Sequence, residues 1–472
     1  MGEKGNKIVP FFCFMKHLLI FCFAFLSLIG FGQYHQGTRF SLDSLPTPTA
    51  LNGKFKFKKT FKAKFNLWVL ADLKSIEADI IFQDIQALQD SFPKLQVVLF
   101  DVGSPHPNQN ALIKNWCNLN QPHFPVVVDE DSVLFKNLAI VNSPNLFVFN
   151  PNGLSLGTLH TEEMKTMLHP YLKQYLDTTA IKLSSKKVFK PNNKFFSNTP
   201  QYQDITVLND TLFFVSERRN NKIHYIKPNQ VNRQTVLVDF EPYAICNSDR
   251  GLLVSSIKNH NIYQSTKGFT KILGDNVREP FRALEKDAYA PLNFPTDVFA
   301  DEKSIYISTA GAHQIWDYTA NNLLGNAYAG NAHYAPFFED GYRYDASLRY
   351  PADMVVVGKE QYFIDGGLNL IRRISGGYLS TPAYNYDLDL KYPTAITSDG
   401  VSLFVVDKVS KTIKTVNLES KKTKELLNFN NEVAEHEFPV SITYTNDKLY
   451  ILFDRKSEIL EYDLTSKSKR YF

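Results

Sequence analysis

The chain has few of the residues that most reactive sites require. Its 472 residues include four cysteines, three tryptophans and five methionines, and its formal net charge is only +4. Nucleic-acid binding depends on a concentrated basic face that displaces counterions from phosphates, so this charge balance argues against it. The sequence also has no Gly-x-Ser-x-Gly, no phosphate-binding glycine loop and no Cys/His cluster, which excludes several common hydrolase, nucleotide and zinc motifs.

Long apolar runs are also scarce. Leu18–Phe31 is an apolar run that follows Lys16 and precedes Gly32-Gln33. It is shorter than the roughly 20 residues that a bilayer-spanning helix needs, and it is typical of a secretory signal peptide. We therefore predict a signal peptide over residues 1–32, a secreted or periplasmic (cell-envelope) location, and no stable membrane span once the signal is removed. The alternatives are an uncleaved anchor and a buried helix.

The cysteines give little support to a disulfide framework. Cys13 and Cys22 lie in or before the signal, which leaves Cys117 and Cys246, one in each expected domain. A disulfide would require their Cα atoms to lie within about 7 Å of each other, which the sequence cannot establish. We expect two separate buried cysteines that pack as small hydrophobic residues, with a disulfide as the alternative.

Residues 54–182, after a proline-containing linker at 33–53, predict an α/β domain. Lys54–Phe65 alternates Phe and Lys, which favours half-buried edge strands over the alternative of a basic surface for anionic ligands. Apolar runs predict further strands at 67–71, 95–101, 125–128 and 145–149. Helical periodicity predicts helices near 76–92, 110–119, 132–138 and 161–182. This alternation predicts a parallel or mixed sheet that is covered by helices.

Residues 199–472, after a second linker at 183–198, contain a repeated pattern. A Pro-led strand, an aromatic and β-branched strand, a polar turn and a third strand recur six times, opening near Tyr202, Pro242, Pro295, Pro351, Pro393 and Pro439. Several short strands at a period of about 40 to 50 residues are typical of a β-propeller. The fold class predicted for the whole chain is therefore multidomain: α/β followed by an all-β, six-bladed propeller.

Several stretches resemble one known family. Residues 83–89, 125–131 and 142–153 are similar to the thioredoxin-like domain that precedes NHL repeats in NHL-repeat-containing proteins, and the blades resemble NHL repeats, including Asp365, Asp407 and Asp454. The resemblance implies a cis proline at Pro144. It also implies a Cys-x-x-Cys motif where this chain has Ile76-Glu77-Ala78-Asp79.

That slot contains no sulfur. Dithiol exchange needs a thiolate nucleophile and a resolving thiol, so we predict a thioredoxin-like domain without redox activity, with a thiol-disulfide oxidoreductase as a minor alternative. The acidic Glu77 and Asp79 would complement the helix dipole; the alternative is a carboxylate pair at the mouth of a site.

Two long connections between blades, 274–292 and 330–348, carry the residues that we predict to bind a partner. Such loops gather on one face of a propeller, and aromatic and arginine side chains dominate interface energetics. The candidates are Tyr334, Phe337, Phe338, Tyr342, Arg343, Tyr344, Arg278 and Arg282. The function predicted is non-catalytic binding of a protein or an envelope-associated ligand, without a cofactor. The alternative is that these aromatics pack beneath their own loops.

A second candidate function is a metal-assisted propeller hydrolase or lyase. His224, His260 and His313 fall near turns of separate blades, so we expect them to be dispersed rather than to converge on a metal, and no metal site is predicted. Asp204, Asp297 and Asp353 follow the blade-opening position by two residues and could line the central channel. Their alternative role is to hold strand ends by hydrogen bonds from the side chain to the backbone.

Overall fold

The computed structural model describes most of the propeller and parts of the amino-terminal half. It describes residues 50–54, 65–74, 77–102, 106–129, 145–149, 155–159, 168, 170, 172–173, 190–191, 199–228, 233–274, 292–301, 303–319, 325–332 and 338–472. The predicted signal peptide, the helix near 132–138, most of the helix at 161–182 and most of both linkers lie outside these residues. No helix in the part of the chain that the structure describes is long and apolar enough to cross a membrane.

The chain forms two compact units. The first contains residues up to Leu73, Ile81–Pro105 and Asn120–Phe196. The second contains Ser197–Phe472 together with two short upstream segments, Lys74–Ile80 and His106–Leu119. The segments matter below, because they include the first turn of helix α3 (Glu77–Ser91) and most of α4 (Gln109–Asn120).

The first unit contains a mixed five-stranded sheet, as the sequence predicted. Its strand order is β4-β3-β2-β5-β6, with β2, β3 and β4 parallel and β5 and β6 antiparallel to their neighbours. The strands are β2 (Phe65–Ala71), β3 (Leu95–Asp101), β4 (Val126–Val128), β5 (Asn145–Phe149) and β6 (Ser155–Leu159). A separate two-stranded sheet pairs β1 (Gly53–Lys54) with β7 (Lys190–Pro191). β2 and β3 are buried along their whole length, which explains why their sequences are continuous apolar runs rather than alternating ones.

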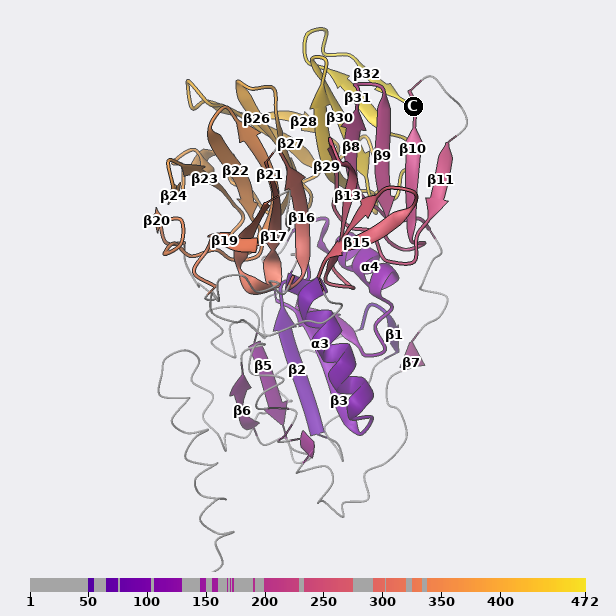
Figure 1. Cartoon of the computed structure of the whole chain (residues 1–472). Helices are drawn as coiled ribbons and strands as arrows, with labels where there is room; N and C mark the ends of the chain where they lie inside the picture. Colours follow the sequence, from indigo (N-terminus) through magenta and orange to yellow (C-terminus); the bar gives the residue numbers. More distant parts are fainter. Residues whose placement is uncertain are drawn as a thin grey trace, which may run out of the picture. The chain divides into compact units, whose positions relative to one another are not determined.

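The second unit contains the six-bladed propeller, which confirms that part of the predicted fold class (Figure 1). Blade 1 is β8 (Tyr202–Leu208), β9 (Leu212–Glu217), β10 (Lys222–Ile226) and β11 (Gln234–Leu237). Blade 2 is β12 (Ile245–Ser248), β13 (Gly251–Ser256), β14 (Asn261–Ser265) and β15 (Phe269–Leu273). Blade 3 is β16 (Pro295–Ala300), β17 (Ser304–Thr309), β18 (Gln314–Thr319) and β19 (Gly325–Ala329), with the short 3₁₀ helix η3 (Ala310–Ala312) between β17 and β18.

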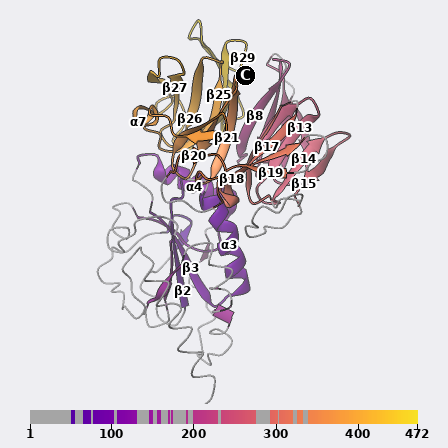
Figure 2. The same cartoon turned by 60° about the vertical axis from the view of Figure 1, so that its left-hand side comes forward.

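Blade 4 has a fifth strand. It consists of β21 (Pro351–Val357), β22 (Glu360–Asp365), β23 (Leu370–Ser375) and β24 (Tyr378–Ser380), to which β20 (Gly341–Tyr342) adds at the outer edge. The short helix α7 (Asn385–Leu388) leads to blade 5, which is β25 (Pro393–Ser398), β26 (Ser402–Asp407), β27 (Thr412–Asn417) and β28 (Thr423–Asn428). Blade 6 is β29 (Pro439–Thr445), β30 (Lys448–Phe453), β31 (Leu460–Asp463) and β32 (Lys469–Tyr471). Figure 2 shows blades 2 and 5 on opposite sides of the ring.

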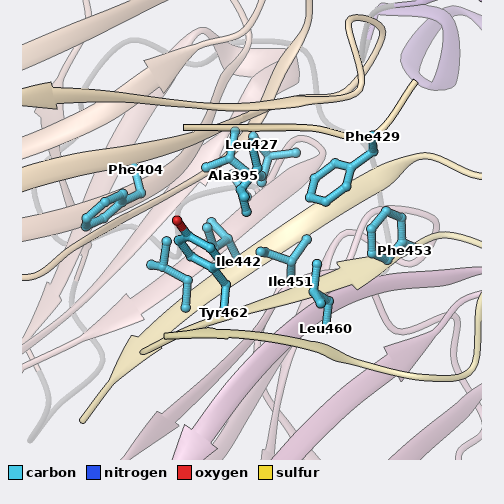
Figure 3. Packing of buried hydrophobic residues seen from close by; sticks show 12 residues of the cluster. Ala395, Phe404, Leu427, Phe429, Ile442, Ile451, Phe453, Leu460 and Tyr462 are labelled. Atoms are coloured by element: carbon cyan, nitrogen blue, oxygen red, sulfur yellow. The ribbon is translucent and has the colours of Figure 1, made fainter. Parts of the chain in front are cut away.

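The hydrophobic core of the propeller lies between its blades. Each pair of neighbouring blades shares one buried apolar cluster, and a cluster also joins blade 6 to blade 1, so the ring is closed. Figure 3 shows the cluster between blades 5 and 6, where the Phe429 ring lies next to that of Phe453. Because the ring is closed, both faces of each blade pack against a neighbouring blade. The second strands are therefore buried on both faces and have continuous apolar sequences such as Leu-Phe-Phe-Val and Leu-Phe-Val-Val.

At the seam between blades 6 and 1 the two sheets pack against each other without sharing any of their described strands. The Tyr202 amide donates to the Asp454 carbonyl (2.8 Å). The Phe213 ring lies 4.5 Å from the ring of Tyr450 and 5.7 Å from that of Phe472. No strand crosses this seam among the described residues, because blade 6 is built only from β29–β32 and blade 1 only from β8–β11. Side-chain packing and hydrogen bonds between blades 6 and 1 therefore hold the ring closed.

The turn before each third strand has a recurring backbone conformation. The last turn residue has φ between 51° and 57° in blades 1 to 5, at Asn221, His260, His313, Asn369 and Lys411. Asn tolerates this left-handed region better than most residues, and the other three positions accept the strain. The third strands begin within one residue of the positions that the repeat pattern predicts, which are Ile223, Ile262, Ile315, Ile371, Ile413 and Ile459. The first strand of blade 2 begins at Ile245, three residues after the predicted Pro242.

Candidate functional site

The three candidate channel carboxylates, Asp204, Asp297 and Asp353, all hydrogen-bond to the backbone of the next blade in the chain. Asp204 Oδ2 accepts from the Ile245 amide (2.8 Å) in blade 2. Asp297 Oδ2 accepts from the Met354 amide (3.1 Å) in blade 4, and Asp353 Oδ2 accepts from the Ile396 amide (2.8 Å) in blade 5. Hydrogen bonding to strand ends was one of the two roles expected for these residues, and the structure places the bond between the inner strands of adjacent blades.

Burial makes these carboxyl groups unusually basic. Burial and the nearby charge of Asp204 together raise the pKa of Asp297 to about 8, against the opposing effect of the amide donors. The pKa of Asp353 is also well above its ordinary value because of burial and the charges of Asp297 and Asp204. For Asp204, burial raises the pKa to about 6 against the hydrogen bonds from Ser441, Ile245 and Ile205. Asp297, which is 6% exposed, is therefore protonated at neutral pH.

The candidate histidines also make structural hydrogen bonds within the propeller. His260 Nδ1 accepts the amide hydrogen of Phe294 (3.2 Å), and His313 Nδ1 accepts that of Tyr350 (3.4 Å). Phe294 and Tyr350 directly precede the prolines that open the next blade, so both histidines join neighbouring blades. His224 lies inside β10 rather than in the predicted turn, and its Nε2 is 2.8 Å from Glu217 Oε2.

The strand-end aspartates of blades 4 to 6 have a matching role within each blade. Asp365, Asp407 and Asp454 accept the amide hydrogens of Arg349, Tyr392 and Phe438 at 2.8–2.9 Å. Each donor lies one or two residues before the blade-opening proline. These carboxylates therefore fix the entry of the first strand against the end of the second. In the part of the chain that the structure describes, no group of three His, Cys, Asp or Glu side chains is arranged to hold a metal ion.

The degenerate redox slot is only partly described. Ile76 lies outside the described residues, and so does Pro144, while the backbone of Glu77 begins α3. Ala78 is buried, and Asp79 lies where the resemblance places the second cysteine. Asp79 accepts hydrogen bonds from the Trp116 indole (3.0 Å) and from Arg218 (3.0 Å), both of which belong, like Asp79, to the second unit.

The two cysteines of the described residues are not bonded to each other. Both are free thiols; Cys117 is fully buried in α4 and Cys246 is half-buried in β12. Burial raises the pKa of both thiols, that of Cys246 to about 12. Neither sulfur is therefore a thiolate at neutral pH, which agrees with the expected packing role.

The predicted binding residues that are described come together at the outer edge of blade 4. β20, from the long connection, pairs with β24 so that Tyr342 lies opposite Tyr378, and their rings are 6.0 Å apart in an edge-to-face arrangement. Arg343 stacks over the rings of Tyr328 (4.3 Å) and Tyr344 (4.8 Å), and it donates a hydrogen bond to the Tyr344 hydroxyl. We call Phe338, Tyr342, Arg343, Tyr344 and Tyr378 the aromatic edge.

The aromatic edge is strongly exposed. Tyr342 is 71% exposed, Tyr344 51%, Tyr378 48% and Phe338 41%, so these rings are not packed beneath the loop. The other predicted members, Tyr334, Phe337, Arg278 and Arg282, lie outside the described residues. Sequence reasoning missed Tyr378, because it sits in an ordinary strand and only the pairing of β20 with β24 brings it to this surface.

Comparison with known proteins identifies no family. No protein-family model matches the chain, and no curated protein matches it. Among solved structures, a streptogramin B lyase is 16% identical over 58% of this chain and 84% of its own, with a TM-score of 0.40. A nidogen/laminin complex is 14% identical over 56% and 92%, with a TM-score of 0.41. A protein of unknown function from Bacteroides thetaiotaomicron is 10% identical over 67% and 81%, with a TM-score of 0.42. At this level of similarity no activity, ligand or partner transfers to this chain.

Proposed function

We propose that this protein is an exported, non-catalytic binding protein and that its partner docks on the aromatic edge of blade 4. The observation that carries the proposal is the exposure of four aromatic rings, those of Phe338, Tyr342, Tyr344 and Tyr378, beside or within the edge of blade 4, together with Arg343, which is stacked on Tyr344. Monomeric proteins seldom leave such rings clustered in solvent without a partner. Tyrosine and arginine contribute most of the binding energy in protein interfaces, because they bury a large area at a small loss of rotamer freedom.

The surroundings of Arg343 prepare it for binding. Its backbone is fixed, since its amide donates to the Gly377 carbonyl (3.0 Å) and its carbonyl accepts from the Gly330 amide (2.8 Å). Its guanidinium is held between two tyrosine rings. A side chain that is already ordered loses little entropy when a partner binds. The partner class that fits is a protein or another envelope-associated ligand that covers aromatic rings and accepts hydrogen bonds from arginine.

The polar groups of the channel support a binding function over catalysis. A general acid, a base or a metal ligand must be able to reach a substrate or ion, but Asp204, Asp297 and Asp353 already accept backbone hydrogens from the next blade. His260 and His313 are committed in the same way. The metal-assisted hydrolase or lyase therefore remains the weaker candidate.

We further propose that the amino-terminal unit is thioredoxin-like and redox-inactive and that the blades are NHL-type repeats. The mixed sheet with three parallel and two antiparallel strands supports the first assignment. Asp79 replaces a cysteine in the motif slot and is engaged in hydrogen bonds, so no thiol is available there. The strand-end Asp365, Asp407 and Asp454 support the second assignment. Export rests on the apolar run Leu18–Phe31.

The docking surface can be tested by photo-crosslinking in the native cell envelope. A photoreactive residue replacing Tyr378 is expected to crosslink one partner, whereas the same residue at Val401, which is also exposed but belongs to blade 5, is expected to crosslink none. With the purified partner, Tyr342→Ala/Arg343→Ala should weaken binding about 30-fold or more, because loss of an interface hot spot costs about 2 kcal/mol or more. Equal binding by the double variant and the wild type, with melting temperatures unchanged, would remove the aromatic edge from the proposal.

A further inference from the structure

One region of the second unit is rich in cations. The residue that directly follows the strand-end acid is basic in three consecutive blades of the closed ring: Arg455 in blade 6, Arg218 in blade 1 and Lys408 in blade 5. Arg219 lies beside them and donates to the Asn118 carbonyl (2.6 Å). Lys408 interacts electrostatically with Arg218 and Asp79, and Arg455 does so with Arg219. These cations therefore share one region of the second unit.

Arg218 is held in a fixed orientation. Its Nε and one terminal nitrogen donate to Glu241 Oε1 at 2.9 and 2.8 Å, and its guanidinium lies 4.8 Å from the ring centre of Tyr243. The remaining terminal nitrogen donates to Asp79 Oδ2 at 3.0 Å, and the side chain of Arg218 is only 6% exposed. The Trp116 indole donates to the other carboxylate oxygen of Asp79. A carboxylate is thus bound at each of its oxygens by a preorganised donor.

The same region has an apolar side next to this carboxylate. Ile80, the residue after Asp79, packs in a buried cluster with Ile257, Phe294, Ala310 and Tyr350 from blades 2 to 4 and their connections. Two consecutive residues of the first turn of α3 therefore occupy two adjoining environments of the second unit. Asp79 fills the cationic one and Ile80 fills the apolar one.

Charge explains why this arrangement suits an acidic ligand. Around Asp79 the cations Arg218, Arg219, Lys408 and Arg455 face the acids Glu241 and Asp454. Without the Asp79 charge the region carries an excess of positive charge in a poorly hydrated setting. An incoming carboxylate would reduce this excess by one charge and accept from the two donors that Asp79 uses, since charge-assisted hydrogen bonds from arginine are among the strong ones.

We propose that this region of the second unit, with its cationic and apolar sides, is a second binding site, which recognises an acidic residue followed by an aliphatic one in a partner protein. Asp79 and Ile80 occupy this site in cis and compete with the partner. The site is separate from the aromatic edge, so its failure would leave the proposed docking surface unaffected.

The test uses the full-length chain and a synthetic peptide with the sequence of residues 77–83, Glu-Ala-Asp-Ile-Ile-Phe-Gln. Asp79→Ala removes the competing carboxylate and weakens the hold of this segment on the site, so the fluorescently labelled peptide is expected to bind this variant about tenfold or more tighter than it binds the wild type, because an occupied site lowers the apparent affinity in proportion to its occupancy. Binding should disappear in Asp79→Ala/Arg218→Gln. It should also disappear with a control peptide in which alanine replaces the aspartate.

Equal peptide affinity for the wild type, the single variant and the double variant would overturn the proposal. If Asp79→Ala is not folded by circular dichroism, Asp79→Asn takes its place, because its amide oxygen still accepts the Trp116 indole hydrogen while the charge is lost. Peptide binding that is no tighter to Asp79→Asn than to the wild type would then overturn it in the same way.

Discussion

Asp297→Asn should change how the stability of the propeller depends on pH. Asp297 is 6% exposed, and burial together with the charge of Asp204 raises its pKa to about 8. An unfolded aspartate has a pKa near 3.9. The folded protein therefore retains this proton to a higher pH than the unfolded chain does. The contribution to stability is complete below about pH 4 and is lost progressively as the pH rises toward 8.

The expected magnitude follows from one proton. Where only the folded state holds the proton, each pH unit removes about 1.4 kcal/mol of stability, so one retained proton accounts for roughly 3 kcal/mol between pH 5 and pH 7. A domain of this size loses about 2 to 4 °C of melting temperature per kcal/mol, which corresponds to about 6 to 12 °C. Asparagine does not ionise here, and its amide oxygen can still accept the Met354 amide hydrogen.

The assay is urea or thermal unfolding of the wild type and the variant from pH 5 to pH 8.5, followed by circular dichroism. The variant should lose less stability than the wild type across this range. The free energy of unfolding of the variant minus that of the wild type should therefore increase as the pH rises. Asp249→Asn, which changes an exposed carboxylate in the turn before β13, is the matched control and should keep the wild-type slope. Parallel slopes for the wild type and Asp297→Asn would refute the assignment of a buried, protonated carboxyl group at this position.

Two further predictions concern buried groups. Arg372→Met should destabilise the propeller by about 3 to 5 kcal/mol in urea unfolding, because Arg372 and Asp365 are both fully buried and pair at 3.0 Å. Adding Asp365→Asn should recover part of this loss. A loss that Asp365→Asn does not reduce would contradict the buried-charge explanation. Cys117 and Cys246 should react slowly with a disulfide reagent at pH 8 in the native protein and rapidly in urea, since burial raises both thiol pKa values; rapid reaction of the native protein would revive a redox function.

The propeller could be predicted from sequence because its repeats are written in local patterns. An apolar second strand, a polar turn and a proline at the blade entry recur with little change, and each reflects a local constraint of burial or backbone geometry. Blade 2 was placed less well, since Pro242 precedes an extended segment in which the Tyr243 amide already bonds to the Ser255 carbonyl before β12 begins. The mixed sheet of the first unit was equally accessible, because fully buried strands are continuous apolar runs.

The contacts that define the sites could not be predicted in the same way. That Asp297 would bond to Met354 depends on how far the ring turns from one blade to the next, which no local pattern encodes. Arg218 was overlooked because it is one of 52 basic residues, and only the folded chain brings Glu241 and Asp79 to it. Tyr378 likewise depends on the pairing of β20 with β24, which are separated along the chain by β21, β22 and β23.

The bonding of the inner strands also bears on whether this channel could support catalysis. For Asp204, Asp297 or Asp353 to act on a substrate, each would have to release an amide hydrogen of the neighbouring blade, and an unpaired buried amide costs about 1 to 3 kcal/mol. The same atoms cannot at once join the blades and exchange protons freely with a ligand. Substitutions at these positions should therefore act first on the closure of the ring, whereas substitutions at the aromatic edge should act on binding and leave the ring intact.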